Sequence, residues 1–173
     1  MAGLSHKDDL LETPPWLVEL IQKETRLLFN LDVCANKSNT ICNEFIDEQL
    51  NALNQEWIIY DISALNTKSK KSEILGGLGT RGLPTVFCNP PRSINYKFVT
   101  KVLEQWKKHN MNIVMLLCWN DLGNKYGEKL FSYILSRRIK VRNLGKIKFY
   151  KNGKETKFPS RLTYLYAWFK SQH

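Results

Sequence analysis

The sequence predicts an α/β fold, a three-layer sandwich with a mostly parallel sheet that ends in an antiparallel C-terminal hairpin. Apolar strand-like segments alternate with amphipathic helix-like segments along most of the chain, and strands that alternate with helices usually pair in parallel. Two strand-like segments, 140–150 and 162–169, then follow one another directly, which favours an antiparallel pair. Because 173 residues with 43% hydrophobic content can bury one core, a single domain over 1–173 is expected.

The helices are indicated by caps and by apolar residues at helical spacing. Thr13-Pro14-Pro15 predicts a helix start, with a hydroxyl cap and prolines that the first turn tolerates. The apolar face that follows predicts a helix through about residue 28. Residues 44–55 are only loosely helical in pattern. Two further helices are predicted from apolar residues at four-residue steps, namely Phe98, Val102 and Trp106, then Tyr126, Leu130 and Ile134 within 122–136.

The strands are indicated by short apolar runs. They are predicted at 29–35, 57–60, 85–88 and 113–119. The last is so continuously apolar that helices should cover both of its faces. Residues 66–82 are rich in lysine and then in glycine, which predicts a mobile surface loop. In a parallel sheet, ligands bind beyond the carboxyl ends of the strands, where Asp32 and Asn89 are expected to lie.

The charge of the chain points to a polyanionic partner. Lysine and arginine outnumber aspartate and glutamate by 26 to 16, and the excess is concentrated after residue 137. Clustered cations that neutralise phosphates release counterions, so nucleic acid is the expected partner. The alternatives are a solvated basic surface, or a hairpin whose lysines discourage edge-to-edge aggregation. The predicted nucleic-acid contacts are Arg92, Arg142, Lys146, Lys148, Lys151, Lys154 and Arg161.

Several classes of protein are disfavoured by what the sequence contains. The four cysteines are widely and irregularly spaced, which suits buried reduced thiols, and the three histidines are scattered, so no metal site is expected. The glycines of 76–82 lack the ending of a phosphate-binding loop. No apolar run approaches the roughly eighteen residues of a membrane span, and no signal peptide is evident, so a cytoplasmic protein is expected.

Asn89-Pro90-Pro91, directly after an apolar strand, is the motif most informative about chemistry. The exocyclic amine of adenine is a poor nucleophile because its lone pair is delocalised into the ring. An asparagine oxygen and the carbonyl of the next proline can each accept an N–H hydrogen bond and draw the nitrogen towards tetrahedral geometry. Two prolines make the corner rigid, so both acceptors are positioned in advance.

Four ordered segments resemble the phage-type Dam family of DNA N6-adenine methyltransferases. They are Thr13-Pro14 with its helix, Leu31-Asp32-Val33-Cys34-Ala35, Val86-Phe87-Cys88-Asn89-Pro90-Pro91, and Leu144-Gly145-Lys146-Ile147-Lys148-Phe149. The resemblance implies a Rossmann-like methyltransferase sandwich that acts on DNA in a host cell and uses S-adenosylmethionine. It implies catalysis at Asn89, Pro90, Pro91 and Arg92, and cofactor binding by Thr13, Pro14, Asp32, Cys34, Ala35, Asp61 and Asn89. The carboxylate of Asp32 could attract the ammonium group of the methionine moiety, and Asp61 could accept hydrogen bonds from the ribose or adenine.

Arg92 departs from the family pattern, which has an aromatic residue at this place to stack on the flipped base. A guanidinium plane can also stack on a base, or it can grip a phosphate instead. Tyr96, Trp119 or Tyr126 could supply the missing ring. Two alternatives remain open: a DNA-binding relative with impaired catalysis, and a protein methyltransferase acting on the N5 amide of glutamine.

Overall fold

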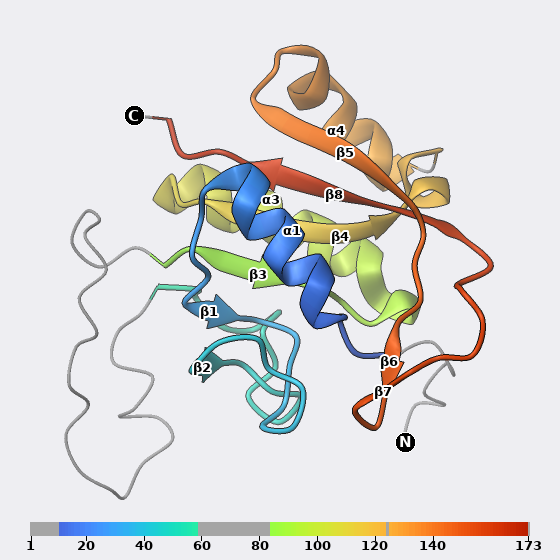
Figure 1. Cartoon of the computed structure of the whole chain (residues 1–173). Coiled ribbons are helices and arrows are strands. Elements are labelled where there is room, and N and C mark those ends of the chain that lie inside the picture. Colours follow the sequence, from blue (N-terminus) through green and yellow to red (C-terminus); the bar gives the residue numbers. More distant parts are fainter. Residues whose placement is uncertain (1–10, 59–83, 124, 173) are drawn as a thin grey trace, which may run out of the picture.

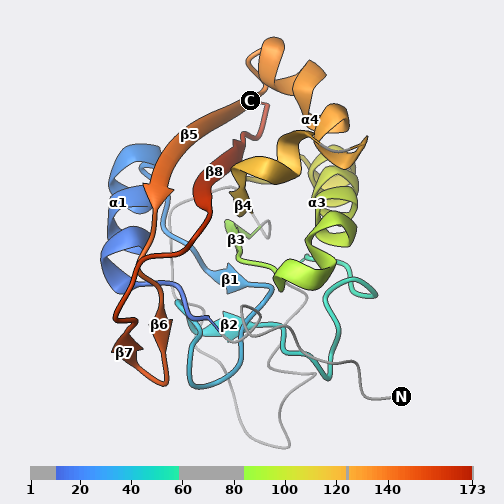
Figure 2. The same cartoon turned by 90° about the vertical axis from the view of Figure 1, so that its right-hand side faces the viewer.

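The computed structural model describes residues 11–58, 84–123 and 125–172, which form a mixed six-stranded sheet covered by helices on both faces (Figures 1 and 2). The α/β class, the mostly parallel sheet and the antiparallel pair at the C-terminus are confirmed. The predicted loop 66–82 and Asp61 lie outside the described residues, as do Ile59 and Tyr60 of the strand predicted at 57–60.

The sheet has the strand order β2-β1-β3-β4-β8-β5. Its parallel part comprises β1 (Leu31–Asp32), β2 (Glu44–Phe45), β3 (Val86–Cys88) and β4 (Ile113–Cys118). β8 (Thr163–Phe169) runs antiparallel to both β4 and β5 (Ile139–Lys146). The segment between β5 and β8 contains β6 (Tyr150–Lys151) and β7 (Lys154–Glu155), which form a separate two-stranded sheet.

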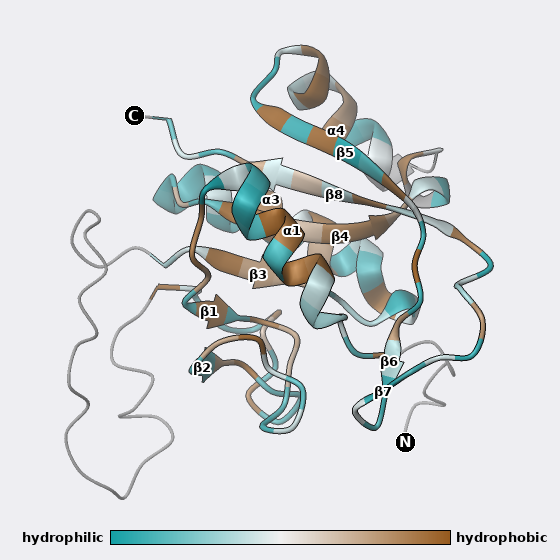
Figure 3. Ribbon diagram, viewed as in Figure 1, coloured by the Kyte–Doolittle hydropathy of each residue, from teal (hydrophilic) through white to brown (hydrophobic). Residues whose placement is uncertain are grey.

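β4 carries the core on both of its faces, as its continuous apolar sequence predicts. Ile113, Met115 and Leu117 pack into the core on the side of α3 (Asn95–His109). The alternate residues of β4 pack with the buried residues of α1 (Pro15–Thr25). Figure 3 shows β3 and β4 in the brown shades of hydrophobic residues. Each fully buried aliphatic side chain contributes roughly 1.5–3 kcal/mol to the stability of the fold. β4 therefore stabilises the packing of both helix layers on the sheet.

The two helices in the second half of the chain also agree with the predictions. Phe98, Val102 and Trp106 are all buried on the inner face of α3. The predicted helix 122–136 is α4 (Lys125–Leu135), which follows a 3-10 turn, η3 (Trp119–Gly123). None of the described helices is long and apolar enough to cross a membrane.

Three local predictions are wrong in extent or type. α1 ends at Thr25 rather than about residue 28, because Arg26 adopts a left-handed conformation (φ 57°). The strand predicted at 29–35 is only two residues long, since the chain leaves the sheet after Asp32. Residues 44–55 are not helical; they form β2 followed by turns.

Trp57 and Ile58 are not in a strand either. Trp57 is instead fully buried in the core, where its indole N–H donates to the carbonyl of Ala52 (2.9 Å) and its backbone N–H donates to Oε1 of Gln105 (2.8 Å). At Trp57 the apolar run therefore marks burial correctly but not the type of element.

The strand order places a topological switch point between β1 and β3. The chain leaves the carboxyl end of β1 towards β2, whereas it leaves the carboxyl end of β3 through α3 towards β4, on the opposite side. In open α/β sheets the crevice beyond such a pair of strands is where ligands bind. The segments that follow Asp32 and Cys88 are therefore the place to look for a site.

Candidate functional site

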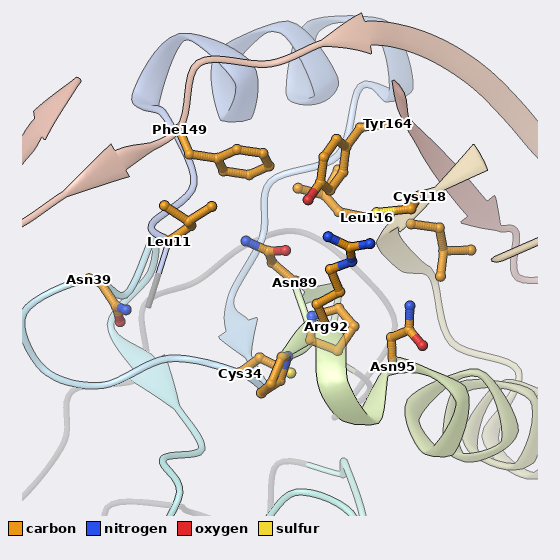
Figure 4. Close-up of a pocket in the computed structure, with 13 residues that line it drawn as sticks. Leu11, Cys34, Asn39, Asn89, Arg92, Asn95, Leu116, Cys118, Phe149 and Tyr164 are labelled. Atoms are coloured by element: carbon orange, nitrogen blue, oxygen red, sulfur yellow. The ribbon is translucent and has the colours of Figure 1, made fainter. Parts of the chain in front are cut away.

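A cavity of about 60 Å³ lies at this switch point. Residues of α3, β4 and β8, and of the segments that follow β1, β3 and β5, contribute to its wall (Figure 4). The lining residues are Leu11, Cys34, Asn39, Asn89, Pro90, Pro91, Arg92, Asn95, Leu116, Leu117, Cys118, Phe149 and Tyr164. The structure thus brings the whole predicted catalytic motif, Asn89 to Arg92, to one cavity.

The diproline corner turns the chain from β3 into α3. Pro91 is the N-cap of a short 3-10 helix, η2 (Arg92–Ile94), and its carbonyl accepts a hydrogen bond from the backbone N–H of Ile94 (3.1 Å). Pro90 is buried and Asn89 is half-buried. Because proline fixes φ, the backbone at this corner has little freedom, and the Asn89 side chain starts from a defined point.

Asn89 is held by the segment that precedes α1. Its Nδ2 donates a hydrogen bond to Oγ1 of Thr13, at 2.9 Å. Figure 4 shows the amide with its oxygen on the side of Arg92 and its nitrogen on the opposite side. Thr13 was predicted to cap α1, and this is wrong: the N-cap residue is Pro14, and no side chain forms a cap hydrogen bond there.

Arg92 and Tyr164 approach the cavity from opposite elements. The guanidinium of Arg92 extends from η2 towards the ring of Tyr164 (Figure 4). Tyr164 pairs with Cys118 in the antiparallel register of β8 and β4, and its ring packs against Phe149 at 4.8 Å between centroids and an angle of 65°. The cavity therefore has an aromatic wall, although Arg92 stands at the position where the family pattern has an aromatic residue.

The aromatic residues proposed from the sequence to replace that ring do not line this cavity. Tyr96 is absent from its wall, and Trp119 lines a separate, more apolar cavity with Phe131. The side chain of Tyr126 is outside the described residues. Tyr164 was missed because it lies in a C-terminal strand that reaches the site only by pairing with β4.

Asp32 lies beneath the cavity wall rather than in it. It is only 3% exposed, and its two carboxylate oxygens accept the backbone N–H groups of Cys34 (3.2 Å) and Ile41 (3.3 Å). Burial raises the pKa of Asp32 to about 6, although the two hydrogen bonds act in the opposite direction. Through these two hydrogen bonds Asp32 stabilises the loop between β1 and β2.

Two thiols also meet at the switch point. The Sγ atoms of Cys34 and Cys88 are 3.8 Å apart, and all four cysteines are free, as predicted. Burial, the Cys88 thiol and the charge of Asp32 raise the pKa of Cys34 well above its usual range. Cys34 is thus a protonated, uncharged part of the wall, whereas the neighbouring Ala35 is buried away from it.

Of the predicted nucleic-acid residues, Arg92 lines the cavity and the other six divide into two groups. Arg142 forms an ion pair with Glu24, which also accepts the hydroxyl of Tyr166 (2.7 Å), so Arg142 is tied to α1. The second group comprises five predicted residues with exposed side chains on or beside the 147–160 segment, namely Lys146, Lys148, Lys151, Lys154 and Arg161. Lys148 lies 3.5 Å from Glu155.

The predicted burial is found, because Ile147 and Phe149 are buried and Lys148 between them is exposed. The strand predicted at 140–150 is wrong in extent, however, since β5 ends at Lys146 and these residues follow it. Since Phe149 also lines the cavity, the basic segment is physically continuous with the site. In the described part of the chain, no group of three or more His, Cys, Asp or Glu residues could hold a metal ion.

Comparisons with known proteins show similarity to a family of DNA methyltransferases. Residues 3–74 match the family model of DNA N-6-adenine-methyltransferase (Dam), a range that includes Thr13 and Asp32. The chain is 27% identical over 139 residues to the DNA N-6-adenine-methyltransferase of Haemophilus phage HP1 (strain HP1c1).

That alignment covers 76% of this chain, so it necessarily includes the central residues, among them Asn89 to Arg92. It covers 65% of the phage protein, so the chain spans slightly less than two thirds of the relative's length. No solved structure matches the chain.

Proposed function

Because the chain is a relative of the Dam family of DNA N-6-adenine-methyltransferases, we propose that it transfers a methyl group from S-adenosylmethionine to the N6 amine of an adenine in DNA. The observation that carries the proposal is the position of Asn89. Its side chain projects from a rigid diproline corner into a cavity at the topological switch point of the sheet. The strand order, with parallel β2-β1-β3-β4 followed by antiparallel β8 and β5, supports a Rossmann-like methyltransferase fold.

In the proposed reaction Asn89 and Pro90 act as hydrogen-bond acceptors. Oδ1 of Asn89 and the carbonyl of Pro90 each accept one N–H of the adenine amine, which turns the lone pair out of the ring plane. The nitrogen attacks the donor methyl carbon while the bond from carbon to sulfur breaks, and one amine proton then leaves to solvent. The rigidity of the corner means that the acceptors need not reorganise during the step.

The wall of the cavity suits the methionine end of the cofactor. Apart from the guanidinium of Arg92, its polar side chains are uncharged, among them Cys34, Asn39 and Asn89, and Asp32 lies two residues from Cys34. With a pKa of about 6, Asp32 is mostly ionised at neutral pH and provides negative potential for the ammonium and sulfonium groups. When bound, S-adenosylmethionine supplies an activated methyl group.

The size of the cavity limits what the described residues alone can enclose. About 60 Å³ has room for a handful of water molecules but not for an entire nucleoside cofactor. The cofactor must therefore extend beyond this cavity, and the residues named above are proposed to hold its reacting end only.

The base would enter between Arg92 and Tyr164. A flipped adenine needs a stacking surface to offset the few kcal/mol of unstacking, and both a guanidinium plane and a phenol ring provide one. Both groups line the cavity that holds Asn89. The exposed lysines of the adjacent 147–160 segment are proposed to contact the phosphate backbone.

Replacement of Asn89 tests the function directly. With Asn89→Ala we expect methylation of adenine in DNA, measured by mass spectrometry of digested nucleosides, to fall by at least about 100-fold, because a preorganised acceptor is lost. Circular dichroism and thermal unfolding should stay close to those of the wild type, since Asn89 is only half-buried.

Asn54→Ala is the matched control, because Asn54 is exposed and outside the cavity wall; its activity should be unchanged. Wild-type protein that forms no N6-methyladenine in DNA of mixed sequence, or full activity in Asn89→Ala, would contradict the proposal.

A further inference from the structure

Thr13 makes a contact with the proposed catalytic asparagine that its sequence motif does not explain. The side chain of Thr13 forms no helix cap, and its Oγ1 accepts the hydrogen bond from Nδ2 of Asn89 at 2.9 Å. The two residues are 76 positions apart in the chain. Such a contact between distant segments depends on the whole fold, and not on the helix that follows Thr13.

The backbone on both sides of Thr13 is anchored. Glu12 exchanges two hydrogen bonds with Tyr150, from N to O at 2.8 Å and in the reverse direction at 3.0 Å. On the other side, the carbonyl of Pro14 accepts hydrogen bonds in the first turn of α1, and Leu17 and Ile21 of this helix are fully buried against the sheet. The hydroxyl of Thr13 is therefore presented to Asn89 from a backbone with little freedom.

The Thr13 hydroxyl anchors one end of the Asn89 amide, and because a hydroxyl can accept from the nitrogen or donate to the oxygen, the charge on the other side selects which end faces the cavity. An asparagine amide can rotate by half a turn and exchange its acceptor oxygen for its donor nitrogen, and only the oxygen can accept an N–H of the substrate amine. With Nδ2 bonded to Thr13, the oxygen lies on the side of Arg92 (Figure 4). The positive guanidinium on that side favours the same orientation, because it attracts the carbonyl oxygen.

We infer that Thr13 is a positioning residue, which holds the amide of Asn89 with its oxygen towards the amino group to be methylated. This inference rests on the proposed function, and it differs from the role that family resemblance implies for Thr13, which is contact with the cofactor. The two roles predict different kinetic effects. A positioning residue changes the rate of the chemical step, whereas a cofactor ligand changes the affinity for S-adenosylmethionine.

Substitution by valine and by serine separates these roles. Thr13→Val keeps the shape of the side chain and removes the hydroxyl, so we expect kcat to fall by about 10- to 100-fold, since small misplacement of a reacting group has effects of this size. The Kd for S-adenosylmethionine, measured by calorimetry, and the KM for DNA should change by less than about twofold. Thr13→Ser keeps the hydroxyl and should restore most of kcat.

A double-mutant cycle makes the assignment specific. In an Asn89→Ser background, where the amide is absent, Thr13→Val should cost little further activity, because coupled residues are non-additive. Thr25→Val, at the far end of the helix that follows Thr13, is the matched control: it removes a buried hydroxyl that donates to the carbonyl of Ile21 (2.7 Å), and it should leave kcat unchanged.

The possible outcomes are distinct. If the wild type is active, any of three results would overturn the role of Thr13 and leave the proposed function intact. They are an unaltered kcat in Thr13→Val, additive effects in the double-mutant cycle, and weaker cofactor binding as the sole change in Thr13→Val. Wild-type protein without methyl transfer would overturn both.

Discussion

Burial and hydrogen bonding have opposite effects on the pKa of the Asp32 carboxyl group. The side chain is 3% exposed, and two backbone N–H groups from Cys34 and Ile41 stabilise its charged form. Loss of hydration is the larger effect, so the pKa rises from 3.8 to about 6. The folded protein therefore binds a proton at this residue in a pH range where the unfolded chain has released it.

This difference in pKa predicts how stability depends on pH. Because the folded state binds more protons between about pH 4 and pH 6, the contribution of Asp32 to stability is greatest below pH 4 and falls as the pH rises to about 6. The total change is about 3 kcal/mol, at 1.36 kcal/mol for each pKa unit. Asp32→Asn cannot ionise, so the stability of the wild type relative to this variant should fall over the same range.

Urea unfolding of both proteins at a series of pH values measures this difference. Asp47→Asn is a suitable control, since Asp47 accepts a backbone hydrogen bond from Leu50 (2.9 Å) but is only half-buried. A constant difference in stability between wild type and Asp32→Asn from pH 4 to pH 7 would show that the folded carboxyl titrates as it does in the unfolded chain.

At the scale of elements, the 147–160 segment combines a fixed apolar side with an exposed basic side. Ile147 and Phe149 are buried, and Thr156 and Ser160 donate backbone hydrogen bonds to the carbonyls of Phe149 (2.8 Å) and Ile147 (2.7 Å). The backbone that carries the exposed lysines is thereby held beside the part of the cavity wall that Phe149 forms. Such a surface suits contact with a phosphate backbone better than with base edges.

We therefore expect the lysines of this segment to determine the salt dependence of DNA binding. In the triple variant Lys148→Gln, Lys151→Gln, Lys154→Gln, each lost phosphate contact should reduce the slope of log K against log salt concentration by about 0.9. Binding should weaken similarly for all DNA sequences, and thermal stability should change little because these side chains are exposed. Fluorescence anisotropy at several salt concentrations measures the slope.

Lys107→Gln is the control for a general loss of charge. Lys107 is exposed in the last turn of α3, and this helix carries the chain away from the carboxyl end of β3, so the residue lies far from the site. A triple variant with the slope of the wild type would place the DNA interface elsewhere.

At the scale of the whole molecule, the sheet decides where a ligand can bind. Segments from the N-terminus, the middle and the C-terminus of the chain line one cavity at the carboxyl ends of β1 and β3. If that crevice holds the reacting end of the cofactor, binding must stabilise the folded chain, because the unfolded chain has no such crevice.

S-adenosylhomocysteine, the product of methyl transfer, is expected to raise the melting temperature. At about 100 times its Kd a ligand stabilises a protein by about 2.7 kcal/mol, which for a chain of this size corresponds to roughly 5–10 °C. Differential scanning fluorimetry measures the shift, and adenosine at the same concentration is the control. The lack of any shift at millimolar concentration would favour the alternative of a DNA-binding relative without cofactor.

The sequence by itself determined the features that local physics controls. Apolar runs identify the buried strands β3 and β4, and helical spacing identifies the inner face of α3. Asn89-Pro90-Pro91 after an apolar strand identifies a rigid corner that presents hydrogen-bond acceptors. Alternation predicts that Ile147 and Phe149 are buried while Lys148 is exposed. These properties depend on a few neighbouring residues, so they can be inferred without knowledge of the fold.

The tertiary structure alone decided which distant residues meet. Tyr164 reaches the cavity because β8 pairs with β4, and Thr13 reaches Asn89 because α1 packs across β3 and β4. It also turned Asp32 into a buried support for a loop and tied Arg142 to Glu24. Contacts of this kind depend on strand order and on the packing of layers, which the side-chain pattern of any single segment does not specify.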